Sequence, residues 1–234
     1  KYSWYINMYI GLFLLTPFLN MIHKSINSAK EYKIFLIILV FLTGTPAFFN
    51  SLSSRTSGFK IFALSDWWTM IYPITYYFIG AYLKRYPVKL SKKILALSLA
   101  SVIALETLLT LFYSWNKPFA NIIGDYGSIL IAAKTVLFFL IFYDVEIKNK
   151  RLSGIISTIS VLSLDIYLAS YISDKLVYIF LMKNIFKSQQ QIMFYFVFVV
   201  TASFSIAFLI SFIRYKAVRL KVIQNSKIYR KLTQ

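Results

Sequence analysis

The chain has 234 residues, of which 59% are hydrophobic and 19% aromatic, and its mean hydropathy is +0.66. This composition excludes a water-soluble enzyme, because one soluble core of this size needs far less apolar surface. The chain has no cysteine and a single histidine. It therefore has no disulfide, no thiol nucleophile and no metal site built from thiolates or paired imidazoles, and we predict no metal.

Charged residues are clustered between apolar runs of about 17 to 25 residues, the length that crosses a hydrocarbon core of roughly 30 Å. This pattern predicts an all-α protein, a polytopic bundle of transmembrane helices with about seven spans. The second span is the shortest. The expected spans are residues 4–22, 34–49, 67–83, 94–115, 128–145, 156–181 and 192–213.

The net charge is +18, from 26 Lys and Arg against 8 Asp and Glu. If alternate loops are assigned to two sides of a membrane, most of the basic residues fall on one side, in the loops near 24–33, 84–93 and 148–151 and in the tail after 213. Basic loops are typical of the cytoplasmic side. We therefore expect an external amino terminus, a cytoplasmic carboxyl terminus and no nucleic-acid partner.

No repeat or linker divides the chain, so we expect one bundle over 1–213 and a basic cytoplasmic tail over 214–234. Apolar residues between the charges of the tail indicate that it lies on the anionic inner leaflet of the lipid bilayer. The chain starts at Lys1 and enters a span almost at once. With an external start, we expect either a cleaved signal or an odd number of spans to precede Lys1, so that this chain is the carboxy-terminal part of a larger protein.

Five ionisable residues fall inside the expected spans, where each costs about 2.5 to 3.5 kcal/mol at a helix centre and so needs a partner or a wet cavity. They are Glu106, Lys134, Asp165, Asp174 and Lys175. Glu106, Lys134 and Asp174 fall at similar depth on successive spans, so these charges can neutralise one another. We expect Asp174 to pair with Lys134.

The sixth span contains a polar stripe at three- and four-residue steps, which places its members on one helix face. Its members are Ser160, Ser163, Tyr167, Ser170, Tyr171, Asp174 and Tyr178, whereas Asp165 falls on the opposite face. Such a stripe either holds neighbouring helices together by hydrogen bonds or forms the wall of a hydrophilic substrate cavity.

Tryptophans lie at the expected outer ends of the spans. They are Trp4, Trp67, Trp68 and Trp115. Indole rings at this depth are typical of an aromatic belt at the headgroup level, and they also suit a stacking platform for a sugar.

Three segments resemble a known family, the integral-membrane acyltransferase 3 family, whose members O-acylate surface carbohydrates. Residues 4–20 end in Pro17-Phe18-Leu19-Asn20 and resemble the family's span with a Pro-Phe-Leu signature. Residues 76–83 resemble its Phe-x-x-Gly-x-x-Leu span, and residues 163–168 resemble its Ser-x-x-x-Tyr-Leu motif. Members have about ten spans, so a chain without the first three would have seven and an external start.

The resemblance implies transfer of an acyl group, most simply acetyl, from cytoplasmic acyl-CoA to a hydroxyl of a surface glycan, with no bound cofactor, in the cell membrane. It also implies that the essential histidine lies upstream of Lys1, so that the catalytic residue is not assigned here and His23 is not given its role. The alternative is a transporter, flippase or polymerase of lipid-linked glycans. The residues we expect to bind substrate or support its cavity are Glu106, Lys134, Tyr167, Ser170, Tyr171, Asp174, Lys175, Trp67 and Trp68.

Overall fold

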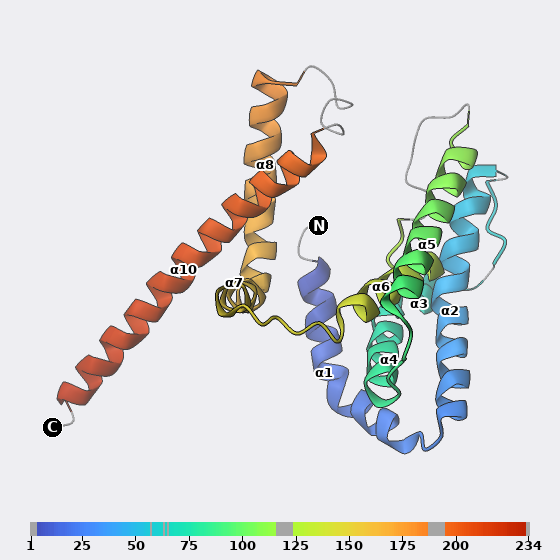
Figure 1. The fold of residues 1–234 in the computed structure, drawn as a ribbon, viewed down its shortest axis with the longest axis horizontal. Helices are drawn as coiled ribbons and strands as arrows, with labels where there is room; N and C mark the ends of the chain where they lie inside the picture. Colours follow the sequence, from blue (N-terminus) through green and yellow to red (C-terminus); the bar gives the residue numbers. More distant parts are fainter. Residues whose placement is uncertain are drawn as a thin grey trace. The chain divides into compact units, whose positions relative to one another are not determined.

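The computed structural model describes residues 4–56, 58–62, 64, 66–115, 124–186 and 195–232, and every regular element in these ranges is an α-helix. The helices belong to two compact units, Trp4–Val145 and Glu146–Gln234 (Figure 1). Four of the described helices are long and apolar enough to cross a membrane, or five if one bent pair forms a single span. This confirms the all-helical class and the presence of several helices able to span a membrane, whereas the expected count of about seven spans and the expected orientation stay predictions. The first residues of the seventh expected span, 192–194, lie outside the described ranges.

The first unit begins with helices α1 (Trp4–Ser25) and α2 (Ala29–Thr56). Helix α2 is longer than the expected span 34–49, in part because a capping sequence before residue 34 starts the helix early. The Ser28 hydroxyl accepts a hydrogen bond from the Glu31 backbone N–H at 3.1 Å. A serine followed three residues later by glutamate is the sequence of a capping box, which satisfies a free N–H group at the start of a helix.

The third expected span is broken into α3 (Asp66–Met70) and α4 (Tyr72–Arg85). Pro73 accounts for the new start, because proline lacks a backbone N–H and is tolerated in the first turn of a helix but not in its interior. The expected span 67–83 is therefore wrong as one continuous helix, and neither piece reaches the length of a span on its own.

Helices α5 (Lys92–Tyr113) and α6 (Ile129–Phe142) complete the first unit. The Lys92 ammonium donates a hydrogen bond to the Leu140 carbonyl at 2.9 Å, which places the start of α5 beside the end of α6. The Arg85 guanidinium donates to the Ile26 carbonyl at 2.8 Å, which places the end of α4 beside the turn between α1 and α2. The basic connections 24–33 and 84–93 therefore share one end of this unit, as the charge pattern predicts.

Large side chains form the core between these helices. Leu19, Tyr32, Leu39 and Phe78 pack together where α4 lies against α1 and α2. At Gly44 a Cβ atom would come within 3.2 Å of the Gly127 carbonyl, so the glycine allows α2 to approach the chain that leads into α6.

The second unit contains α7 (Lys150–Val161), α8 (Ser163–Asn184) and α10 (Phe196–Leu232). The Asn149 side chain accepts hydrogen bonds from the N–H groups of Arg151 and Leu152, which starts α7 before the expected span. Helices α7 and α8 meet at Leu162 with a bend of 72°. The expected span 156–181 is therefore not one straight helix.

Helix α10 continues past the expected end of its span, through the basic segment, to Leu232. Within this helix only Phe196–Val218 has the apolar character of a span. The basic tail thus begins as an extension of the last apolar helix.

Small residues bring α8 and α10 into close contact (Figure 1). Ser203, Ala207 and Ser211 repeat at four-residue steps along α10 and are buried, and Ala169 and Ser173 are buried on α8. Without a hydrophobic driving force between helices in lipid, such small side chains let two backbones approach and gain dispersion energy.

We expect Ala207→Phe to destabilise the second unit, because Ala207 is fully buried against α8 and a larger side chain there overpacks the contact at a cost of about 1–3 kcal/mol. The measurement is the thermal unfolding midpoint of the purified protein in detergent. Leu209→Phe is the control, since Leu209 lies on the exposed side of the same helix. Equal midpoints for the two variants would contradict this packing.

Candidate functional site

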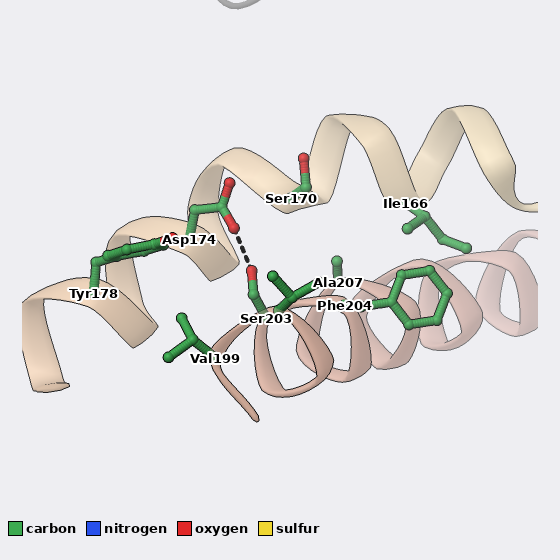
Figure 2. Close-up of a pocket in the computed structure, with 9 residues that line it drawn as sticks. Ile166, Ser170, Asp174, Tyr178, Val199, Ser203, Phe204 and Ala207 are labelled. Carbon is green, nitrogen blue, oxygen red and sulfur yellow. Dashed lines mark hydrogen bonds between the residues drawn. The ribbon is translucent and has the colours of Figure 1, made fainter. Parts of the chain in front are cut away.

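A groove between α8 and α10 contains the carboxylate of Asp174 (Figure 2). Its volume is about 170 Å³. This is smaller than the roughly 300–1,000 Å³ of a pocket that encloses a whole small molecule. A groove of this size has room for only one part of a small molecule. Its lining residues are Ile166, Ser170, Asp174, Tyr178, Val199, Val200, Ser203, Phe204 and Ala207.

Asp174 is held by a hydroxyl from the opposite helix. The Ser203 hydroxyl donates a hydrogen bond to Asp174 Oδ1, as drawn in Figure 2. The buried Ser173 hydroxyl lies 3.3 Å from the Ser203 hydroxyl and also donates to the Ser170 carbonyl at 3.0 Å. The Ser203 hydroxyl thus holds the carboxylate at the side of the groove.

The polar stripe expected on the sixth span is confirmed over part of its length. Ser170, Asp174 and Tyr178 follow one another at four-residue steps of α8 and all line the groove. Ser160 does not share their helix face, because it lies on α7, before the bend. These stripe residues therefore join two helices through the Asp174–Ser203 hydrogen bond and also line a groove.

The remaining candidates of α8, Tyr167, Tyr171 and Lys175, do not line the groove. The Lys175 ammonium is 4.5 Å from the centre of the Tyr171 ring, a cation–π contact that gives this cation an aromatic face. Tyr167 is half-buried, and its carbonyl accepts a hydrogen bond from the Ser170 hydroxyl at 2.7 Å.

Asp165 makes a different contact, as its position on the opposite face predicts. It forms an ion pair with Arg214 of α10. This pair connects the start of α8 to the last turns of the apolar part of α10.

The first unit contains a second pair of charges within apolar helices. The Lys134 ammonium on α6 lies 2.5 Å from Glu106 Oε2 on α5, and the side chains are 32% and 17% exposed. Lys134 therefore has Glu106 as its partner, and the expected pair of Lys134 with Asp174 is wrong. The physical reason is adjacency: α5 packs directly against α6, so the nearest acid at the same depth comes from the preceding helix.

Trp67 and Trp68 lie on the short helix α3 of the first unit and are 79% and 48% exposed. The structure thus groups Glu106 with Lys134 in the first unit, and Ser170 with Asp174 in the second.

Sequence reasoning missed Ser203, which donates a hydrogen bond to the carboxylate, and Ser173, whose hydroxyl lies 3.3 Å from that of Ser203. The signal for Ser203 was present as the four-residue repeat of small residues in the last span, Ser203, Ala207 and Ser211. Such a repeat predicts a close helix contact, and a hydroxyl within it is placed to bond across the contact.

A family model described as an acyltransferase domain, the acyltransferase 3 model, matches residues 1–212. The chain belongs to the acyltransferase 3 family. No curated protein and no solved structure matches it. The match covers the first unit and continues in the second into the apolar part of α10, and it assigns the chain to a family of membrane acyltransferases.

In a member of this family, the groove supplies groups that suit a hydroxyl-bearing ligand. A carboxylate oxygen accepts a hydrogen bond from a hydroxyl, and the aromatic rings of Tyr178 and Phe204 present apolar faces. A carboxylate near a reacting hydroxyl also polarises its O–H bond, as in general base catalysis.

We expect Glu106→Gln and Lys134→Met each to lower the stability of this acyltransferase, since each leaves one charge of the pair unmatched among apolar helices. The double variant should recover much of the loss, with a coupling energy of about 0.5–3 kcal/mol. The measurement is the unfolding midpoint of the four proteins in one detergent.

Asp144→Asn is the control for this cycle. Asp144 lies 3.9 Å from Lys92 in an exposed pair, whose loss should change the midpoint little. If the effects of Glu106→Gln and Lys134→Met simply add, the two side chains are not coupled.

Proposed function

We propose that this chain acts in the transfer of an acyl group, most simply acetyl, from acyl-CoA to a hydroxyl of a cell-surface carbohydrate, in the cell membrane. The observation that carries the proposal is the acyltransferase match over residues 1–212, in a chain whose apolar helices contain a carboxylate-lined groove. In the reaction the thioester C–S bond breaks and an ester C–O bond forms. The hydroxyl proton passes through a base to the released CoA thiolate.

The groove around Asp174 suits the carbohydrate side of this reaction. Sugars present hydroxyls beside apolar ring faces, and the groove presents a carboxylate beside Tyr178 and Phe204. The small volume suits contact with one sugar ring or one ring edge of a longer glycan. We assign Asp174 to acceptor binding and Ser203 to holding Asp174 in place.

Deletion of the complete gene that encodes this chain tests the proposal. We expect the surface glycan to keep its sugar composition and chain length but to lose most of its alkali-labile acetyl groups, measured by proton NMR before and after mild base. Reintroduction of the gene should restore them.

The transporter, flippase or polymerase alternative gives a different result. Loss of one of these activities shortens or removes the surface glycan, so the amount and length of the glycan change and not only its acetyl content. A deletion strain with unchanged acetylation would contradict the acyltransferase proposal for this glycan.

Asp174→Asn in the complemented strain tests the role of the groove. Loss of a hydrogen bond to a charged group is worth about 1.5–3 kcal/mol, so we expect acetyl transfer from labelled acetyl-CoA in membranes to fall about tenfold or more at low acceptor concentration. Glu146→Gln, a change of an exposed carboxylate outside the groove, is the control. Equal protein levels must be verified by immunoblot, and equal activities of the two variants would exclude Asp174 from acceptor binding.

A further inference from the structure

A second pocket, distinct from the Asp174 groove, lies between the ends of α1 and α4 in the first unit. Its volume is about 510 Å³, within the range of small-molecule pockets. His23, Lys84 and Arg85 line it, together with the polar side chains of Asn20 and Tyr77. None of its lining residues is acidic.

The pocket has a fixed polar frame. The Arg85 guanidinium donates hydrogen bonds to the carbonyls of His23 at 3.3 Å and Ile26 at 2.8 Å. His23 Nδ1 lies 2.8 Å from the hydroxyl of Tyr32, which is fully buried. The Tyr77 hydroxyl donates to Asn20 Oδ1 at 2.8 Å. These bonds connect α1, α2 and α4 around the pocket.

Arg85 and Lys84 differ in the hydrogen bonds that they make within the described part of the chain. Both bonds from Arg85 come from one terminal nitrogen, and a guanidinium has five N–H donors, so donors remain for a ligand. Lys84 is exposed, and within the described part of the chain no hydrogen bond or ion pair engages its ammonium. The pocket therefore combines one oriented cation and one uncommitted cation, with no carboxylate to neutralise them.

This combination is suited to an anion with several oxygens. Arginine binds phosphate through paired N–H donors, and lysine adds a compact point charge. A single carboxylate would use only part of this set, whereas a phosphate ester can engage Arg85, Lys84 and His23 together.

We propose that the pocket between α1 and α4 binds a phosphate ester. We identify this phosphate ester as the acyl-CoA donor, whose phosphates would lie in the pocket. This identification rests on the proposed function. The charge pattern places this end of the unit on the cytoplasmic side, where acyl-CoA is found. A phospholipid headgroup has the same phosphate chemistry, and the experiment distinguishes the two sources.

The test measures binding to the purified 234-residue chain in phosphatidylcholine nanodiscs, which requires no turnover. We expect CoA to bind and pantetheine, which lacks phosphates, not to compete. Lys84→Gln should weaken CoA binding about tenfold by isothermal titration calorimetry. Lys24→Gln should change it less than twofold, since Lys24 lies in the last turn of α1 at the same basic end but does not line the pocket.

A parallel arm measures retention of phosphatidylglycerol by native mass spectrometry. If Lys84→Gln reduces lipid retention and leaves CoA binding unchanged, the phosphate site stands but the assignment to the donor is overturned. If Lys84→Gln and Lys24→Gln behave alike toward both ligands, the site itself is overturned. Loss of surface acetylation on gene deletion is a separate result, so failure of the proposed function and failure of this pocket are distinguishable.

Discussion

Lipid offers no hydrogen bonds, and this constraint determines where the polar side chains of the apolar helices lie. Glu106 on α5 meets Lys134 on α6, and the Ser203 hydroxyl on α10 meets Asp174 on α8. Thr43 on α2 lies 3.1 Å from Thr75 on α4 through their hydroxyls, and both are buried. In each case the polar group joins neighbouring helices, so the same bonds that lower the cost of burial also fix which helices pack together.

The sequence predicted the elements whose signals are local. Composition and apolar run length predicted the helical class and most helix positions, because these depend on the thickness of the bilayer and not on the partner of each helix. The errors occur where a local signal overrides hydropathy. Ser28 starts α2 early, Pro73 starts a new helix within the third expected span, and Asn149 starts α7 well before residue 156.

Partner choice was harder to predict, because depth along a helix says nothing about which helices are neighbours. Similar depth led to the expectation that Lys134 pairs with Asp174. Helix α6 instead packs against α5, which supplies Glu106 as the partner of Lys134. Asp174 also accepts a hydrogen bond from a group that carries no charge. A hydroxyl within a run of small residues on α10 holds it, and charge counting does not register a hydroxyl. The position of Asp174 on a polar stripe, by contrast, follows from helical periodicity alone, and the groove confirms it.

The contrast between Lys134 and Lys84 connects this constraint to function. Lys134 lies within an apolar helix and has a carboxylate 2.5 Å away, because an unmatched cation at that depth is costly. Lys84 lies in the last turn of α4, where it is exposed and water can solvate it, so its charge does not need a partner from the chain. An uncommitted cation is therefore tolerated at the end of a helix and not in its middle. A pocket at a helix end can therefore keep its positive charge available for a ligand. The pocket lined by Lys84 and Arg85 has such a charge, and hydrogen bonds such as that from Arg85 to the Ile26 carbonyl fix its polar groups.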